Sequence, residues 1–217
     1  LAGFMLAFVT SLDDVVITGN EAVGEGGGLL SYLGSLSVTD SVISGNTAGT
    51  GAAGAKVGEQ ASGAEVEISD TEISGNTLYC SVNPCRAGGI AMVGGEIEDS
   101  TISGNYAPGA YAGGLDLIAG ATATDVTVAD NRSGSNGGGV AMSGSGSLLS
   151  SSTVSDNFTY RGGGGVFVES SGNSILDTTI SGNEASLGGG GINVEGDLTM
   201  RRATVADNDA GLEGGGV

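Results

Sequence analysis

Acidic side chains recur at one fixed position of this 217-residue chain. The sixth residue before a repeated Asn is, in turn, Asp14, Asp40, Asp70, Asp99, Asp125, Ser151, Asp177 and Arg202. Stacked carboxylates repel one another, so something must offset their charge. Ca²⁺ could bridge the oxygens of Asp40, Asp70, Asp99 and Asp125, because hard cations prefer such ligands. The alternative, favoured by the lack of an Asp-x-Asp-x-Asp-Gly loop, is that each Asp accepts backbone N–H groups in a corner turn.

A second group of carboxylates could act on a polysaccharide. Glu169 and Glu195 occupy equivalent positions in adjacent repeats, on an outward strip that also carries Asp116. We expect the two Glu residues to lie about 4.8 Å apart, close to the spacing of about 5 Å in a retaining glycosidase. The alternative is that all three are solvated surface residues. The regular repeats and the 4 % aromatic content favour this non-catalytic interpretation, because a sugar groove needs ring-bearing walls.

Other reactive groups are scarce. The chain has no His, which excludes Ser-His-Asp catalysis and imidazole metal sites. Its two cysteines, Cys80 and Cys85, lie in a predicted insertion at residues 77–87. We predict that they form a disulfide, which would indicate an oxidising compartment; the alternative is two reduced thiols. Two cysteines without His are too few for a zinc site. We expect no cofactor.

These residues are positioned by a repeat. A tripeptide ending in Asn recurs eight times, at spacings of 25 to 30 residues and most often 26, and each Asn precedes a glycine cluster or its degenerate equivalent. The third residue before every Asn is Ile or Val, and the eighth is apolar. The repeated Asn residues are Asn20, Asn46, Asn76, Asn105, Asn131, Asn157, Asn183 and Asn208.

A period of this length with alternating short apolar strands and glycine corners is typical of a β-solenoid. Gly accounts for 44 residues, which disfavours long helices. We expect about eight coils of two or three strands each, with the Asn side chains stacked as an amide ladder. The apolar segment Leu1–Val9 matches the strand that follows each glycine cluster, and we interpret it as a strand rather than the tail of a signal peptide.

The charge of the chain disfavours some classes of binding partner. The formal net charge is −19, which disfavours binding to nucleic acid or anionic lipid. The longest apolar run is about half of the ~20 residues that a membrane span requires. We therefore expect neither a nucleic-acid partner nor a membrane span.

The outward strip that carries Asp116 is otherwise apolar. An exposed apolar row along a rod predicts packing against a partner or a sister molecule, unless the glycine-rich loops cover it. The candidate interface residues are Met5, Leu30, Tyr32, Val93, Ile118 and Phe167.

The pairing of Gly-Gly-x-[Ile/Leu/Val] with a hydrophobic-x-x-Asn motif, as in Val128-x-x-Asn131, resembles the repeat of polymorphic outer-membrane proteins. These are autotransporter-type surface proteins with a right-handed parallel β-helix of the pectate-lyase-like superfamily. The chain departs from them in having Ile or Val for the Phe of Phe-x-x-Asn, and usually a third Gly for the Ala after Gly-Gly. The resemblance implies a right-handed β-helix and an extracellular or cell-surface setting in bacteria or archaea.

Together these observations predict an all-β protein, a single right-handed parallel β-helix over residues 1–217. We expect an extracellular structural or adhesive rod without catalysis. It would associate end to end or laterally, or continue in a longer chain, and could take a carbohydrate or host-surface ligand. The alternative is a polysaccharide-binding or polysaccharide-cleaving β-helix.

Overall fold

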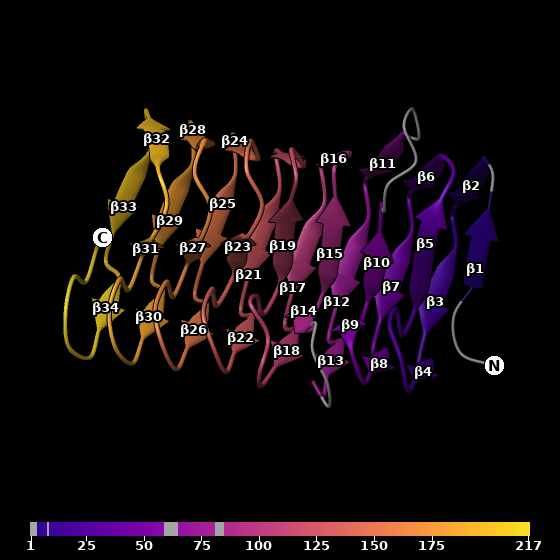
Figure 1. The fold of residues 1–217 in the computed structure, drawn as a ribbon, viewed down its shortest axis with the longest axis horizontal. Helices are drawn as coiled ribbons and strands as arrows, with labels where there is room; N and C mark the ends of the chain where they lie inside the picture. The colour runs from indigo at the N-terminus through magenta and orange to yellow at the C-terminus, as the bar shows by residue number, and fades with distance from the viewer. Residues whose placement is uncertain (1–3, 8, 59–64, 81–84) are drawn as a thin grey trace.

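The computed structural model describes residues 4–7, 9–58, 65–80 and 85–217 and shows a β-solenoid (Figure 1). Four parallel sheets, named A to D here, run along the solenoid, and each contains eight strands, one from each coil. The N- and C-terminal coils lie at opposite ends of the molecule. The described residues form no helix, and hence none of the length and apolarity that could cross a membrane.

Sheets A and B contain most of the longer strands. Sheet A consists of β1 (Phe4–Ala7), β5 (Leu29–Leu33), β10 (Ala55–Val57), β15 (Ile90–Val93), β19 (Leu115–Ile118), β23 (Val140–Met142), β27 (Val166–Val168) and β31 (Ile192–Val194). Sheet B consists of β2 (Thr10–Asp13), β6 (Leu36–Thr39), β11 (Val66–Ser69), β16 (Glu96–Glu98), β20 (Thr122–Thr124), β24 (Leu148–Ser150), β28 (Asn173–Leu176) and β32 (Leu198–Arg201).

Sheets C and D contain shorter strands. Sheet C consists of β3 (Val16–Thr18), β7 (Val42–Ser44), β12 (Glu72–Ser74), β17 (Thr101–Ser103), β21 (Thr127–Ala129), β25 (Thr153–Ser155), β29 (Thr179–Ser181) and β33 (Thr204–Ala206). Sheet D consists of β4 (Glu21–Ala22), β8 (Thr47–Ala48), β13 (Thr77–Leu78), β18 (Tyr106–Ala107), β22 (Arg132–Ser133), β26 (Phe158–Thr159), β30 (Glu184–Ala185) and β34 (Asp209–Ala210). A fifth, two-stranded sheet joins β9 (Gly51–Ala52) to β14 (Cys85–Ala87).

The interior is a stack of apolar rows. The middle residue of each sheet C strand points inward, and Ile43, Ile73 and Ile102 pair in register with no exposed surface. β-Branched side chains suit this position because they pack well on a pleated surface. The predicted inward row is therefore confirmed. In the row eight residues before each Asn, Met200 is the exception, with 40 % of its surface exposed, because no further described coil packs on it.

The Asn ladder is confirmed, and it also binds the backbone. The Nδ2 of Asn46 donates to Asn76 Oδ1 at 3.0 Å and to the carbonyl of Ile17 at 3.0 Å. Its Oδ1 accepts from both the backbone N–H and the Nδ2 of Asn20. The same amide-to-amide bond, 2.9 to 3.1 Å long, links each neighbouring pair from Asn20 to Asn208.

The glycine corners are required by this ladder. A Cβ on Gly139 would lie 2.7 Å from the Nδ2 of Asn157, and one on Gly138 would lie 2.2 Å from a backbone oxygen of the next coil.

The residue before each ladder Asn is a different position, and it has a positive φ, 60° at Gly45 and 56° at Asp156. Only Gly and, less readily, Asp or Asn adopt that conformation at low cost, which explains why this position holds only Gly or Asp.

Each coil has four strands in place of the expected two or three. The fourth, in sheet D, is only two residues long and contributes one inward side chain per coil, such as Ala48 or Thr159. A two-residue strand has no alternation of its own, so the period-2 pattern did not reveal it.

The insertion predicted at residues 77–87 is less separate from the core than expected. Thr77–Leu78 is the regular strand β13, and Cys85–Ala87 pairs with β9. Cys80 and Cys85 form a disulfide with a Cα–Cα distance of 5.5 Å. Cys85 is 1 % exposed and packs with Leu78 and four alanines in a second apolar cluster. Residues 81–84 lie outside the described part of the chain.

Replacing Ile73 by Asp should unfold the middle coils. The substitution places an unpaired carboxylate among fully buried apolar residues, which costs several kcal/mol and is a large share of a typical folding free energy. Thermal melting followed by circular dichroism measures the loss. Glu72→Ala, on the exposed neighbouring residue, is the matched control and should melt like the wild type; equal melting of the Ile73→Asp protein would contradict the inward assignment.

Candidate functional site

The outer face of sheet A carries one row of side chains in strict register. Backbone pairing aligns, in order along the solenoid, Met5, Leu30, Lys56, Ala91, Asp116, Ala141, Phe167 and Asn193. From Lys56 to Phe167 these residues are at most 5 % exposed. The expectation of an exposed apolar interface is therefore wrong for Phe167, which is 1 % exposed.

Glycine- and alanine-rich segments cover this face. Ala52, Ala87 and Ala112, from the segments that follow sheet D, pack with Ala91 and Ala141 in one apolar cluster. Their side chains are too small to hold the segments away from the sheet, so the backbone lies close to it. Leu30, Tyr32, Val93 and Ile118 remain half-buried, and the side chain of Met5 lies outside the described part.

Charged residues are enclosed beneath these segments. Lys56 Nζ lies 3.0 Å from Glu25 Oε2, with side-chain exposures of 7 % and 18 %. Its ammonium group also lies 5.0 Å from the ring centre of Tyr32. Lys56 lies two rungs from Asp116 along the row, so the two groups do not form one site.

A second polar group, named the Asp116 cluster here, consists of Arg86, Tyr111, Asp116, Ser143 and Glu169. Asp116 has no exposed surface, and Ser143 Oγ donates a hydrogen bond of 2.5 Å to its Oδ1. Its Oδ2 accepts no hydrogen bond from the described residues, and Arg86 Nη1 lies 3.8 Å away. The guanidinium of Arg86 lies 5.6 Å from the centre of the Tyr111 ring and also donates to Ser143 Oγ at 3.4 Å.

Burial dominates the electrostatics of this cluster. Desolvation raises the pKa of Asp116 to about 7, although the hydrogen bond from Ser143 and the charge of Arg86 act in the opposite direction. The charge of Glu169 raises the pKa of Tyr111, and burial adds to this rise. Tyr111 donates a hydrogen bond to Glu169. At neutral pH the buried Asp116 carboxyl group is therefore close to half-protonation.

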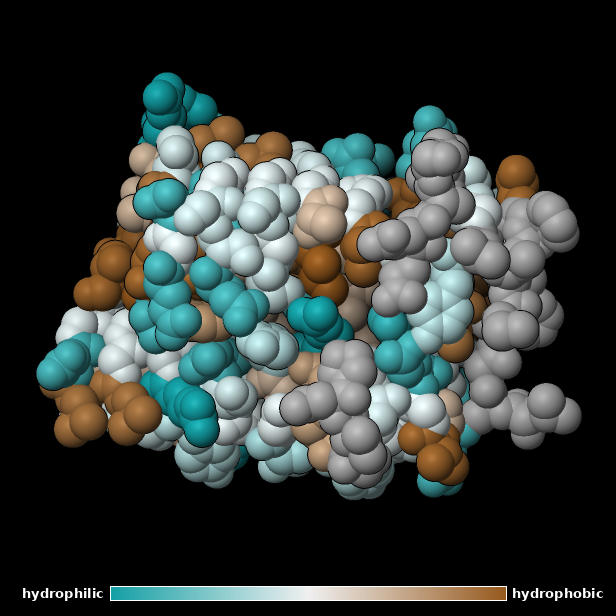
Figure 2. Space-filling model, in the orientation of Figure 1, coloured by the Kyte–Doolittle hydropathy of each residue, from teal (hydrophilic) through white to brown (hydrophobic). Residues whose placement is uncertain are grey.

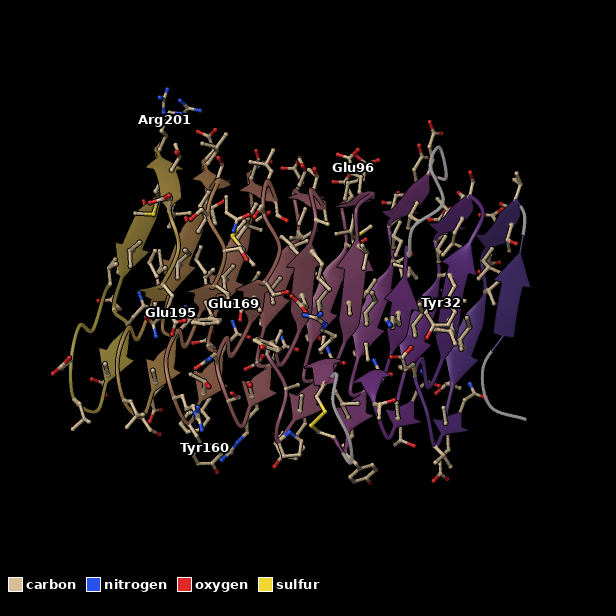
Figure 3. All side chains as sticks on the ribbon, in the orientation of Figure 1. Tyr32, Glu96, Tyr160, Glu169, Glu195 and Arg201 are labelled. Carbon is tan, nitrogen blue, oxygen red and sulfur yellow. A yellow bond between two sulfur atoms is a disulfide. The ribbon has the colours of Figure 1, made fainter. Side chains whose placement is uncertain are left out.

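The three predicted carboxylates are placed differently from one another. Val168 and Val194 pair in register, so Glu169 and Glu195 follow on adjacent rungs, as expected (Figure 3). Glu169 is half-buried, whereas Glu195 is exposed. Asp116 lies on the outer face as predicted, but it is buried rather than solvated.

Sequence reasoning missed Arg86, Tyr111 and Ser143 as members of the cluster. Arg86 directly follows the disulfide-bonded Cys85, so the bond fixes the segment that carries the guanidinium. That adjacency in sequence was the one available signal. The two other residues required knowledge of how the covering segments fold over sheet A.

The recurring Asp position is a backbone corner between sheets B and C. Asp14, Asp40, Asp70, Asp99, Asp125, Ser151, Asp177 and Arg202 all have positive φ, between 46° and 53°. All are exposed, and Asp40, Asp70 and Asp99 line a shallow depression of about 460 Å³. Among the described residues no group of three or more His, Cys, Asp or Glu side chains is arranged to hold a metal ion.

The last two residues of this row of corner positions, Asp177 and Arg202, form an ion pair. Arg202 donates to both carboxylate oxygens of Asp177, at 2.5 and 2.7 Å, and lowers the pKa of Asp177. Both side chains are exposed, so the pair contributes little to stability. Ser151 and Arg202 adopt the same corner conformation at a higher conformational cost than Asp, so the corner itself does not require a carboxylate.

The parallel β-solenoid described above agrees with a match to a protein-family model. The family described as right handed beta helix region has a model that matches residues 62–216. Comparison with curated proteins and with solved structures finds no significant match.

Asp116 should make the stability of the protein depend on pH. Between about pH 4 and 7 the folded protein holds a proton that the unfolded chain releases, so the free energy of unfolding falls as the pH rises through this window. The loss is roughly 4 kcal/mol at most, from about three pKa units. Urea unfolding at several pH values measures this slope.

Asp116→Asn cannot ionise and should flatten the slope between pH 4 and 7. Asp125→Asn is the matched control, because Asn also tolerates the left-handed corner and the side chain is exposed. An equal slope in the Asp116→Asn and wild-type proteins would contradict the assignment.

Proposed function

Because the chain belongs to the right-handed β-helix family, we propose that this protein is an extracellular structural rod, used as an adhesive surface passenger or as a filament subunit. The observation that carries the proposal is the Asn ladder, whose bonds run without interruption from Asn20 to Asn208. All four main sheets also keep their eight strands in sequence order. Such regularity makes a stiff scaffold along one axis.

One feature supports a location outside the cytoplasm, and a second favours a rod that stays in solution. The disulfide between Cys80 and Cys85 is the kind of bond that persists in oxidising compartments. The net charge of −19 keeps a repetitive β protein soluble and resists non-specific aggregation.

The direction of the ladder supports end-to-end association. Each ladder Asn accepts from the coil before it and donates to the coil after it, as Asn46 does with Asn20 and Asn76. A further coil, from a second copy or from adjoining chain, could therefore continue the ladder beyond Asn208 by offering an amide oxygen. Exposed backbone groups of the terminal strands would pair in the same step.

Electron microscopy of the purified chain tests the rod proposal. We expect rods that extend beyond the ~40 Å length of eight rungs and grow by end-to-end addition. Asn208→Ala should shorten them, because the terminal amide can no longer continue the ladder. Asn136→Ala, which alters a half-buried Asn outside the ladder, is the control. Single particles at every concentration would contradict the assembly.

A second candidate function, polysaccharide binding or cleavage, rests on the Asp116 cluster. Glu169 is half-buried, Arg86 is partly exposed, and Asp116 keeps a proton near neutral pH. Glycoside hydrolysis uses a pair of carboxyl groups, one of which its surroundings keep protonated. Glu195, one rung away, offers a second exposed carboxylate.

Release of reducing ends from a panel of polysaccharides tests this second candidate. If the protein cleaves one, Glu169→Gln should abolish the release, because the amide can neither attack nor accept a proton. Glu96→Gln, on the exposed outer side of sheet B, should retain it. Failure of the wild-type protein to release any product excludes cleavage.

A further inference from the structure

Exposed apolar side chains gather on the edge formed by sheet D. Val9, Val217 and residues in the first and last strands of sheets A to C apart, the exposed large apolar residues of the described part all lie in sheet D strands or within two residues after them: Val23, Tyr79, Tyr106, Tyr160, Leu187 and Leu212. Figure 2 shows hydrophobic side chains at both ends of this lower edge. The exposed apolar surface expected on sheet A is therefore found on a different side of the rod.

The centre of this edge, named the aromatic edge here, consists of Tyr79, Tyr106, Arg132, Phe158 and Tyr160. Tyr106, Arg132 and Phe158 pair in register on three successive rungs. The rings of Phe158 and Tyr160 meet edge to face with centres 5.0 Å apart. Four of the nine aromatic residues of the chain (five Tyr and four Phe) lie here.

Arg132 is held in place by the rings. Its guanidinium carbon lies 4.6 Å from the centre of the Phe158 ring and 5.0 Å from that of Tyr160. It also donates a hydrogen bond to the hydroxyl of Tyr160. The result is a preorganised surface in which ring faces alternate with N–H and O–H groups. Tyr160 points away from the ribbon at the lower edge of Figure 3.

The charge of the protein decides between partners for this surface. A net charge of −19 repels nucleic acid and anionic lipid. The exposed Glu184 pairs in register with Phe158, so an anionic polymer would meet a carboxylate beside the rings. Each sheet D strand is only two residues long. The surface that these strands form is therefore too narrow for the roughly 800 Å² per partner of a stable protein interface.

We propose that the aromatic edge binds a neutral polysaccharide laid along the rod. Pyranose rings have apolar C–H faces that stack on tyrosine and phenylalanine, and hydroxyl groups that accept from Arg132 and pair with tyrosine O–H. Rungs lie about 4.8 Å apart, and rings stand on the rungs of Tyr79, Tyr106 and Phe158 with Arg132 on the rung between the last two, so one chain can contact several of them. The proposal rests on the extracellular adhesive function, for which it supplies a ligand class and a surface.

Titration of the purified wild-type chain with neutral β1,4- and β1,3-linked hexasaccharides tests the proposal. Because the chain has no Trp, quenching of Tyr fluorescence reports on these rings, and calorimetry gives the Kd. Tyr106→Ala and Tyr160→Ala should each weaken binding about three- to tenfold. Leu187→Ala removes a side chain of the same 47 % exposure as Tyr160 and should leave the Kd unchanged.

Several outcomes would overturn the proposal. These are no binding of any neutral hexasaccharide at millimolar concentration, an equal loss from Leu187→Ala and Tyr160→Ala, or binding confined to polygalacturonate and abolished by salt. Self-association of the wild type that Tyr160→Ala prevents would show that the edge joins copies instead. If the protein forms rods but binds no hexasaccharide, only the polysaccharide proposal is contradicted. If it binds hexasaccharide but stays as single particles, only the rod proposal is contradicted.

Discussion

The contact between the Asn ladder and the glycine corner is the constraint on which the rest of the structure depends. Each ladder amide donates to the next amide and to a carbonyl of the preceding coil, so its donors are satisfied without water. This is required because Asn46 to Asn183 are at most 1 % exposed, and an unpaired buried amide is costly. The ladder fixes the register of successive coils at the turn between sheets C and D, and the glycine that packs on it must be Gly because a Cβ would strike the amides.

The covering of sheet A follows from the same glycines and carries an electrostatic cost. Segments of Gly and Ala lie flat on the outer row, which encloses Lys56 and Asp116. Lys56 recovers this cost through a short ion pair with Glu25, whereas Arg86 approaches Asp116 only to 3.8 Å. Removing one partner of a buried pair costs about 3–5 kcal/mol. Asp116 instead reduces its cost by keeping a proton near neutral pH.

The inward rows, the Asn ladder and the corner position of the Asp residues could be predicted because they repeat, and stacking places like residues above one another. The burial of Phe167 and Asp116 could not, because it depends on segments whose path is set by what their small side chains allow. Sheet D was hidden because two residues carry no periodicity. Arg86 joined the Asp116 cluster through an insertion present in one coil, where the repeat gives no guidance.

This arrangement separates the parts of the rod that must be kept from those that can change. A substitution at Asn105 or Gly89 disturbs the ladder in two neighbouring coils, because each amide bonds both ways. At the aromatic edge, by contrast, Tyr106 and Phe158 stand on strands whose single inward residue is Ala107 or Thr159. The outward residues there take no part in the apolar rows or the amide bonds. A binding surface on sheet D can therefore differ from coil to coil while the solenoid that holds it remains the same.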